Sequence, residues 1–475
     1  MVIMANIVRV LAIDLGASSG RGIIFQLCDG KLKQKVIHRF PNGAVERECR
    51  LYWDLDMLFE EVVKAIGIAC KDGKLDGVGI DTWGVDFGIV DKDGKAICDD
   101  FRNYRNPANA AVRNSLDNSA RKRLFEIAGI SDNDFNTTYQ LIARAREDYD
   151  FDSVEHMLFT PQLLGYMLTD VAVSEPTISS TSGFYRQDQG FDEDFLKQCN
   201  IPKEILPRSV DTCSIIGNLK ENIKQEIGIK YDLPVIATPG HDTACAVLGV
   251  PSQEEYPLFL SSGTWSLFGA LEDKPIVNDD AWKYGYTNEL AFGEKVRLLR
   301  NIMGMWIIQE CRRQWISEGE NIDYPQIVAL AKDSQDKGAF IDVNDSSFAL
   351  PCNMADSVKA YVLAKQGIKL NTIGEVARCV YTSLAKAYKD AYNGLVKLTG
   401  RKYDKLYIIG GGANNDYLNQ IIADTLGIEV SAGPSEASAL GNAIGQFVGL
   451  GAIKSNQIKS IIVDNYDVKI FLPKK

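Results

Sequence analysis

The sequence has no run rich in lysine and arginine, and its acidic residues outnumber its basic ones. The 63 Asp and Glu residues against 52 Lys and Arg residues give a formal net charge of −11. Nucleic acids and anionic membrane surfaces are bound chiefly through basic patches, so the composition argues against either partner. It does not argue against a phosphate-bearing small molecule, because backbone N–H groups bind phosphate without side-chain charge.

Two further absences concern cysteine and long apolar runs. The ten cysteines include no Cys-x-x-Cys pair, and none of the 475 residues lies in an apolar run of transmembrane length. A zinc cluster, a thioredoxin-like site and a membrane span are therefore not expected. The amino-terminal residues also lack the cationic segment and cleavage site of a secretory signal. Because scattered cysteines are typical of a reducing compartment, we expect a cytoplasmic protein.

The common nucleotide-binding signatures are also missing. The sequence has no Gly-x-x-x-x-Gly-Lys-Ser/Thr motif and no protein-kinase catalytic motifs. Gly410-Gly411-Gly412 is not a dinucleotide fingerprint, since residue 415 is Asn. The triple glycine follows a predicted strand, 406–409, where it would let a flat ligand or phosphate approach the main chain. A simple strand-to-helix turn explains the same pattern.

Two strand–turn–strand segments share one design. The apolar run Leu11–Leu15, which contains Asp14, enters the small-residue turn Gly16–Gly20, and a second apolar run leaves it. Far downstream, Leu258–Leu260 enters a Ser-Ser-Gly-Thr turn in the same way. Such turns can aim several N–H groups at one anion, and a neighbouring acid can hold a metal-bound phosphate. Either segment alone is more simply an ordinary hairpin, but the pair indicates two related domains with a phosphate chain between them.

The order of predicted elements is that of an α/β protein. Three antiparallel strands over residues 7–40, a helix capped by Asp54 and a strand at 78–80 form the opening of a ribonuclease-H-like domain. The proline-flanked polar segment 251–257 indicates a linker. We therefore predict two ribonuclease-H-like domains, residues 1–250 and 251–475, with a central cleft.

Other predicted elements are less regular in spacing. They are a hairpin over 87–97, a strand over 233–237 followed by a helix from Ala244, a strand over 297–302, a helix over 303–315, a helix over 376–398, and an α/β segment over 406–447 whose Gly441 and Gly445 allow close helix packing. Residues 110–230 are mainly helical, and 318–372 carry no strong motif.

The dipeptide His241-Asp242 stands where the predicted strand 233–237 ends and a small-residue helix begins. An acid at such a point can take the proton of a hydroxyl group and direct its oxygen toward phosphorus. The alternative is that Asp242 caps the following helix. The local sequence favours neither.

The stretch Asp81-Thr-Trp83-Gly84-Val-Asp86 places two acids and a tryptophan in a loop at the end of a strand. Indole rings stack on sugar faces, and acids bind sugar hydroxyls. A buried tryptophan that anchors the loop is the rival interpretation. The sequence Gly16-x-Ser18-x-Gly20 also matches a hydrolase nucleophile elbow, but that motif requires a helix directly after the turn, and a strand is predicted there.

Together these stretches resemble the FGGY carbohydrate kinases of the sugar-kinase/Hsp70/actin superfamily. The resemblance runs over nearly the whole chain, and its weakest parts are 110–230 and 318–372. Two of its stretches resemble the L-rhamnulose kinases of that family in particular, Gly79–Phe87 and His241–Ala244. The others are Asp14–Arg21, Leu260–Leu267, Asn301–Gly304 and Gly433–Ser438.

The resemblance implies ATP- and Mg²⁺-dependent phosphorylation of a small ketose, L-rhamnulose at its 1-hydroxyl, by a monomer or homodimer. Asp242 would be the general base. The sugar site would be formed by Asp81, Trp83, Gly84, Arg105, His241, Asp242, Thr243 and Asn301. ATP would be held by Ala17, Ser18, Ser19, Gly20, Arg21, Thr264, Gln309 and Gly411, with Asp14 near the Mg²⁺.

One departure bears on the substrate. Relatives often carry Asp-x-Arg where this chain reads Asn103-Tyr104-Arg105, so the charge of the acid is missing. The alternatives are therefore another FGGY ketose kinase, for L-fuculose or a pentulose, and a nucleotide-dependent switch without a sugar. A sugar-sensing repressor lacks support, since no helix-turn-helix extension or basic patch is present.

Overall fold

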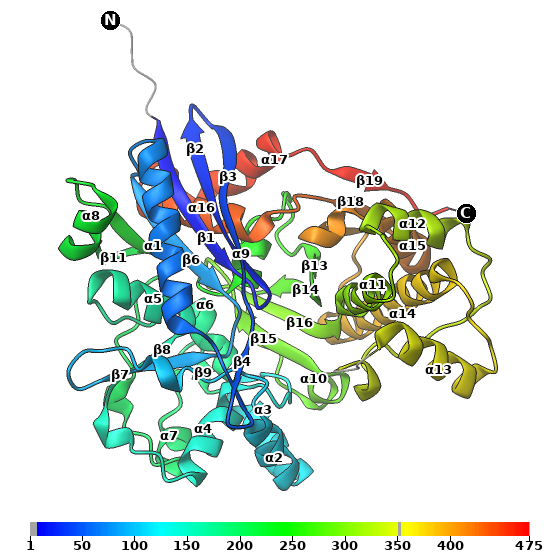
Figure 1. Ribbon diagram of the computed structural model, residues 1–475, viewed down its shortest axis with the longest axis horizontal. Coiled ribbons are helices and arrows are strands. Elements are labelled where there is room, and N and C mark those ends of the chain that lie inside the picture. Colours follow the sequence, from blue (N-terminus) through cyan, green and yellow to red (C-terminus); the bar gives the residue numbers. More distant parts are fainter. Residues whose placement is uncertain (1–6, 350–352, 475) are drawn as a thin grey trace, which may run out of the picture. The chain divides into compact units, whose positions relative to one another are not determined.

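The structure, a computed structural model, describes residues 7–349 and 353–474, whose contacts separate into two units (Figure 1). Unit 1 comprises Met1–Gly249, Glu272–Leu298 and Ala437–Asn465, and unit 2 comprises Val250–Leu271, Leu299–Glu436 and Tyr466–Lys475. Two segments from the second half of the chain thus belong to unit 1. The division into continuous domains, 1–250 and 251–475, stays a prediction.

Six strands form the main sheet of unit 1, in the order β11-β12-β6-β1-β2-β3. Strands β1, β2 and β3 pair antiparallel with one another in chain order, as their apolar runs and intervening turns predict. β6 is parallel to both β1 and β12, which places the carboxyl ends of these three strands at one edge of the sheet. The bounds are β1 Val8–Leu15, β2 Ser19–Cys28, β3 Lys31–Pro41, β6 Gly77–Thr82, β11 Ser214–Asn218 and β12 Pro234–Ala237.

Helices pack on both faces of this sheet. The alternation of β6 separates the faces: Val78 and Ile80 join the hydrophobic core that includes the apolar side of α1, Leu55–Asp72. A Cβ on the intervening Gly77 or Gly79 would instead meet side chains of α16, Ala437–Gly449. Asp54 caps α1 by accepting a hydrogen bond from the Met57 N–H, as predicted. The close approach of α16 to α9, Asp242–Leu248, requires Gly441, whose Cβ would lie 1.8 Å from the Cys245 carbonyl oxygen.

The predicted hairpin over 87–97 forms, with its turn at residues 92–94: the Ile97 N–H donates to the Ile89 carbonyl and the Asp91 N–H to the Lys95 carbonyl, both at 2.9 Å. The sequence did not predict that β7, Phe87–Asp91, also pairs along its length with β8, Val154–Phe159. The reason is burial: β7 is almost wholly apolar and needs an apolar neighbour, which β8 supplies from the distant helical region.

The remaining elements of unit 1 lie mainly between residues 45 and 227. They are β4 Val45–Arg47, β5 Arg50–Tyr52, α2 Pro107–Ser115, α3 Asn118–Ala128, α4 Thr137–Arg146, α5 Thr160–Thr169, α6 Pro176–Ser179, β9 Tyr185–Arg186, β10 Gly190–Phe191, α7 Glu193–Gln198, α8 Glu221–Ile227, α10 Asp279–Tyr284, β15 Tyr286–Leu290 and α17 Ile458–Asn465. Strand β16, Val296–Met303, begins in unit 1 and continues in unit 2.

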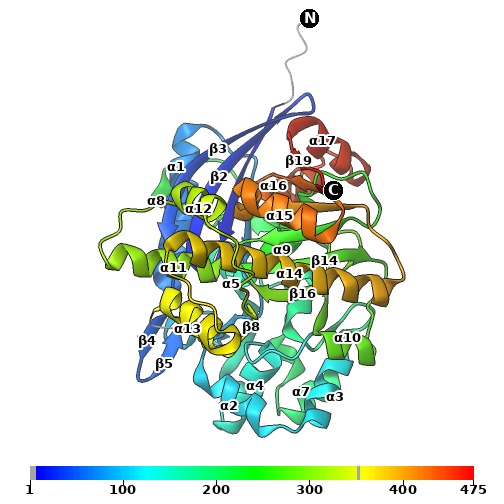
Figure 2. The ribbon, with the colours of Figure 1, turned by 90° about the vertical axis from the view of Figure 1, so that its right-hand side faces the viewer.

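Unit 2 repeats the plan of a hairpin followed by parallel strands. β13 and β14 form the hairpin, β17 and β18 continue the sheet in parallel, and β19 closes its edge antiparallel. The long helix α14 contacts α12 and α15 (Figure 2). The bounds are β13 Leu258–Ser262, β14 Trp265–Glu272, α11 Trp306–Ser317, α12 Tyr324–Asp333, α13 Met354–Gln366, α14 Ile373–Thr399, β17 Lys405–Ile409, α15 Asp416–Leu426, β18 Glu429–Ala432 and β19 Lys469–Phe471.

Most of the predicted strands and helices are confirmed within a few residues, including the meander, α1, α14 and the strands of the last quarter. In the part of the chain that the structure describes, no helix is both long and apolar enough to cross a membrane.

Candidate active site

Three carboxylates gather at the carboxyl edge of the unit 1 sheet. Asp14 and Asp81 are paired neighbours on the parallel strands β1 and β6, and Asp242 begins α9 just after β12. A bridge between Thr82 and His241 brings the start of α9 to the end of β6. Burial, assisted by the charges of Asp14 and Asp242, raises the pKa of Asp81 well above its usual value.

Asp81 is fully buried and is bound by a side chain from the far end of the chain. Asn442 on α16 donates from Nδ2 to Asp81 Oδ2 at 2.6 Å. Within the described residues, Asp81 Oδ1 is buried without a hydrogen-bond partner. Because carboxylate oxygens are the ligands that Mg²⁺ prefers, this edge suits an ion that keeps phosphate oxygens and water as its other ligands.

Asp242 is the most exposed of the three carboxylates, with 29% of its side chain accessible. The interpretation of Asp242 as a helix cap is wrong: α9 begins at Asp242 rather than at Ala244, and the capping position belongs to His241. The Asp242 carboxylate instead accepts from Thr243 Oγ1 at 3.1 Å, and its Oδ1 lies 3.3 Å from His241 Nε2. A half-buried carboxylate held beside a histidine is suited to accept a proton from a ligand.

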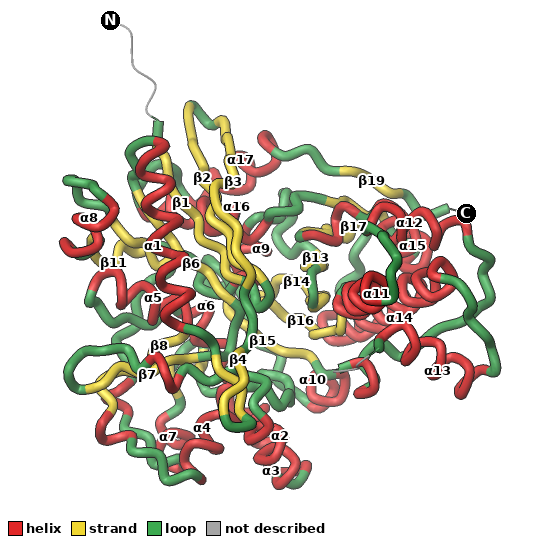
Figure 3. The backbone as a smooth tube through the Cα atoms, viewed as in Figure 1, coloured by secondary structure: helices red, strands yellow, loops and turns green. Residues whose placement is uncertain are grey.

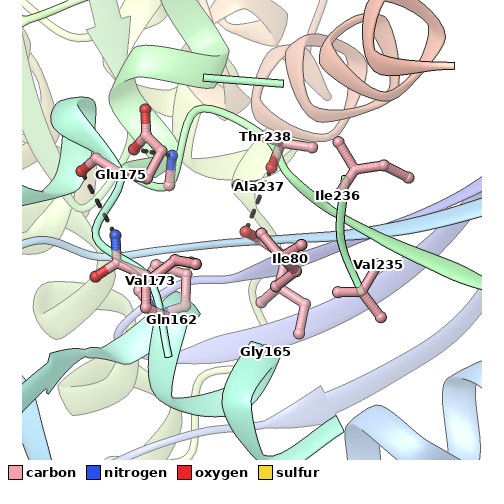
Figure 4. Close-up of a pocket in the computed structure, with 12 residues that line it drawn as sticks. Ile80, Gln162, Gly165, Val173, Glu175, Val235, Ile236, Ala237 and Thr238 are labelled. Atoms are coloured by element: carbon pink, nitrogen blue, oxygen red, sulfur yellow. Dashed lines mark hydrogen bonds between the residues drawn. The ribbon is translucent and has the colours of Figure 1, made fainter. Parts of the chain in front are cut away.

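The segment that leads to Asp242 is held by a hydrogen bond to the side chain of Glu175, which is 1% exposed. Its carboxylate accepts from the Gly240 N–H at 3.0 Å and from the Thr212 hydroxyl at 2.5 Å. Figure 4 shows Glu175 beside Gln162 at the wall of a mainly apolar pocket. None of the predicted sugar-site residues lines that pocket, and Gly240, in the segment that leads to Asp242, does.

The loop after β6 contains a buried carboxylate bound by two indole groups. Trp53 Nε1 and Trp83 Nε1 donate to Asp86 Oδ2 at 2.6 and 2.9 Å, and the two tryptophan rings pack with centroids 4.2 Å apart. Burial raises the pKa of Asp86 to about 7 despite these bonds and one from Gln140. This geometry favours the interpretation of Trp83 as the anchor of the loop, while Gly84 remains half-buried beside Thr181.

The predicted phosphate turn of unit 1 joins β1 directly to β2 (Figure 3). Ser18 and Ser19 are exposed, Ala17 and Arg21 are half-buried and Gly20 is buried, with the Phe40 ring where a Cβ would stand. Arg21 Nε pairs with Asp14 Oδ2 at 3.0 Å. The hydrolase interpretation is wrong, because a strand and not a helix follows the turn.

Unit 2 brings together the predicted nucleotide residues Thr264 and Gln309, whose side chains approach to 3.4 Å. The Thr264 carbonyl accepts N–H groups from Gly304 and Trp306, which fixes the turn against the start of α11. Gly411 lies in the turn after β17, and a Cβ there would meet no atom within 4 Å. Asn301, on β16, also belongs to unit 2.

The residues that replace the family's Asp-x-Arg pattern lie in a loop of unit 1. Asn103 is buried, and its Oδ1 accepts the Arg105 N–H at 2.8 Å. Its amide thus shapes the loop, as a carboxylate would, and Arg105 lies half-buried over the Tyr104 ring. The role of Arg105 at a sugar site stays a prediction, as do the roles of the other predicted residues.

Sequence reasoning missed four buried residues at this site, Glu175, Glu289, Arg297 and Asn442. Asn442 left a signal that could have been used: it and Gln446 are polar residues one turn apart in a helix of small and apolar residues. The other three left none. Arg297 contacts His241 across 56 residues of sequence, and no local pattern marks such a pair.

Comparisons with known proteins identify the family of the chain. The profile of the FGGY family of carbohydrate kinases matches residues 9–249 with its N-terminal domain and 258–450 with its C-terminal domain. The chain is 35% identical to a rhamnulokinase from Oceanobacillus iheyensis, over 96% of this chain and 97% of the relative. It is 34% identical to a rhamnulokinase from Bacteroides thetaiotaomicron, over 93% and 90%.

Among solved structures, a gluconate kinase from Lactobacillus acidophilus matches with a TM-score of 0.81 at 16% identity, over 99% of this chain and 94% of that one. This likeness confirms the predicted fold class, α/β with two actin-like, ribonuclease-H-like parts. The family's profile covers both halves, and full-length relatives exceed 30% identity. The chain belongs to the FGGY family of carbohydrate kinases.

Proposed function

We propose that this protein is a rhamnulokinase, which transfers the γ-phosphoryl group of ATP to the 1-hydroxyl of L-rhamnulose in the cytoplasm and releases ADP. Two relatives named rhamnulokinase support L-rhamnulose as the substrate. Membership of the FGGY family of carbohydrate kinases supports phosphoryl transfer to a sugar. The observation that carries the chemistry is the Asp242 carboxylate, which is partly accessible at the carboxyl edge of the sheet and follows a segment whose Gly240 N–H is bound by Glu175.

In this mechanism Asp242 takes the proton of the sugar's primary hydroxyl as the oxygen attacks phosphorus. Its neighbours determine its orientation, because His241 and Thr243 both approach Oδ1. Closing the site around the substrates would exclude water, which would otherwise compete with the sugar as acceptor.

The nucleotide would be held by the two turns. Backbone N–H groups of residues 17–20 and the Arg21 guanidinium suit phosphate oxygens, and Thr264, Gln309 and Gly411 form the contribution of unit 2. Asp14 and Asp81 would lie near a Mg²⁺ held by the ATP phosphates, and such an ion would supply neutralisation of developing charge. Among the described residues, no group of three or more His, Cys, Asp or Glu side chains could hold a metal ion.

The test is release of ADP from Mg·ATP in the presence of L-rhamnulose, L-fuculose, L-ribulose, D-xylulose or glycerol. We expect a strong preference for L-rhamnulose. Preference for another ketose would keep the reaction and change the substrate, and would direct attention to Asn103. Release of ADP that no sugar stimulates would contradict the proposal and favour a nucleotide switch.

A further inference from the structure

A buried arginine–glutamate pair lies against the histidine that precedes the proposed base. Arg297, on β16, is fully buried, and Glu289, on β15, is nearly so. Their charged groups approach to 3.2 Å. Both terminal nitrogens of Arg297 lie 3.2 Å from His241 Nδ1, and Glu289 Oε2 lies at the same distance from that atom. All of these residues belong to unit 1.

Both members of the pair are charged. Burial alone would raise the pKa of Glu289, but the charge of the Arg297 guanidinium opposes burial, and the pKa lies below its usual value. Burial lowers the pKa of Arg297, yet a guanidinium starts so far above neutrality that it keeps its proton. Arg297 also donates from Nε to the Leu290 carbonyl at 3.0 Å, which fixes the direction of its fork.

This arrangement favours one tautomer of His241. Its Nδ1 faces two nitrogens of a guanidinium, which can only donate, and one oxygen of Glu289, which can only accept, so the two donors favour a lone pair on Nδ1. A neutral imidazole then carries its proton on Nε2, which lies 3.3 Å from Asp242 Oδ1. The Thr243 hydroxyl donates to the same oxygen, so both donors engage Oδ1 and leave Oδ2 to meet the substrate.

We propose that Arg297, held by Glu289, is a positioning residue that fixes His241 as its Nε2–H tautomer, so that the histidine orients Asp242 with Oδ2 toward the reacting hydroxyl. This inference rests on the proposed role of Asp242 as the general base. It adds two residues to the machinery that touch neither the sugar nor ATP.

The direct test is nuclear magnetic resonance of the full-length protein labelled with ¹⁵N-histidine at neutral pH. The chain has three histidines, so the signals of His241 are identified by their loss in His241→Gln. We expect a protonated Nε2 and an unprotonated Nδ1. A protonated Nδ1, which would donate to Glu289, or an imidazolium with both nitrogens protonated, would overturn the inference. This readout requires neither substrate nor activity, so it stands or falls independently of the proposed function.

Kinetics supply the second test. Arg297→Lys keeps a charge beside Glu289 but lacks the fork that faces Nδ1, so kcat should fall roughly tenfold with KM for ATP unchanged. A glutamine amide has no tautomers, so Arg297 has nothing to fix when His241 is replaced by Gln. Adding Arg297→Lys to His241→Gln should therefore change kcat by about twofold or less. Equal losses in both backgrounds would show a merely structural role and overturn the proposal.

Two further variants guard against a trivial result. Arg9→Lys is the matched control, because Arg9 is a largely buried arginine with several carbonyl partners at the opposite end of β1 from Asp14, and its kcat should not change. If Arg297→Lys does not fold, the paired change Arg297→Met with Glu289→Gln removes both charges together, which buried pairs tolerate better than the loss of one partner. The inference predicts a mixture of His241 tautomers in that variant, and a spectrum identical to the parent would contradict it.

Discussion

The two strand–turn–strand hairpins have the same backbone plan but different surroundings. The turn of unit 1 lies among carboxylates, with Asp14 on the entering strand and Asp81 beside it on the next strand. The turn of unit 2 has uncharged partners: Thr264 meets Gln309, and Ser262 lies against the glycines after β17. Each turn could accommodate phosphate through backbone N–H groups, and the turn of unit 1 has the acids Asp14 and Asp81 at its base.

This difference separates two tasks. Proton transfer and metal-assisted chemistry need titratable or charged groups, and the described residues near the unit 1 turn supply them. Contact with a nucleotide needs close approach and hydrogen bonds, which glycine, threonine and glutamine provide. We therefore expect substitutions at the unit 1 carboxylates and their donors to lower kcat, and substitutions at Thr264, Gln309 and Gly411 of unit 2 to raise KM for ATP. The predictions below test that separation.

The largest effect should come from Asp242→Asn. An amide keeps the shape but cannot take the proton, so kcat should fall by roughly 10²–10⁴-fold while the Kd for ATP is retained. Single-turnover kinetics and equilibrium ATP binding would measure the two quantities. Asp93→Asn, in an exposed turn of the same unit, is the control and should be unaffected. Near-full turnover in Asp242→Asn would remove this residue from the mechanism.

The buried carboxylates of unit 1 should also make the free energy of unfolding depend on pH. Asp86 has a pKa of about 7 in the folded protein against an ordinary value of 3.8, so in that pH window the folded state keeps a proton that the unfolded chain has lost. Rising pH therefore destabilises the parent, on the order of 1 kcal/mol per pH unit between about pH 4 and 7, and not beyond. Asp86→Asn abolishes this titration.

The measurement is the denaturant unfolding free energy of parent and Asp86→Asn at several pH values. The stability advantage of the parent should be greatest near pH 4 and should shrink as the pH approaches 7. Asp100 provides the contrast: burial would raise its pKa, but Arg144 and Arg102 outweigh burial and lower it. Stability contributed by Asp100 is therefore lost on acidification, and Asp100→Asn should be costliest near neutral pH. A pH-independent difference for Asp86→Asn would contradict the assignment.

The fold was predictable wherever the signal was local. Alternating apolar runs separated by small-residue turns predicted β1 to β3, and helical spacing behind Asp54 predicted α1, because each depends on neighbours within a few residues. The partner of β7 was not predictable in this way, since β8 lies some sixty residues away and only burial selects it.

The site divides along the same line. Asp14, Asp81 and Asp242 were predictable because each follows an apolar strand run, and ends of parallel strands meet at one edge. Glu289 and Arg297 were not, because an ion pair within the core leaves no spacing to detect. The sequence also left open whether Asp242 caps its helix. That question was settled only when the backbone placed His241 at the capping position.

Two adjacent glycines of unit 2 should separate structure from binding. A Cβ at Gly412 would stand 2.0 Å from Ser262 Oγ and 2.5 Å from its Cβ, so Gly412→Ala should lower stability by about 1–3 kcal/mol. A Cβ at Gly411 meets nothing within 4 Å, so Gly411→Ala should keep the parent Tm and raise KM for ATP. Thermal unfolding and ATP titration measure the two. An unchanged KM in Gly411→Ala would remove this glycine from the nucleotide site.

The smallest effects should come from one methyl-for-hydroxyl exchange made in each unit. Thr243→Val removes a donor to Asp242 Oδ1, so its loss should appear in kcat, whereas Thr264→Val removes a group facing Gln309 and should act on KM for ATP. Each hydrogen bond is worth about 1 kcal/mol, or roughly fivefold. Initial rates over a grid of ATP and ketose concentrations separate the two constants. If both variants lowered kcat, the two units would not divide the work, and the neutral turn of unit 2 would have to take part in the chemical step itself.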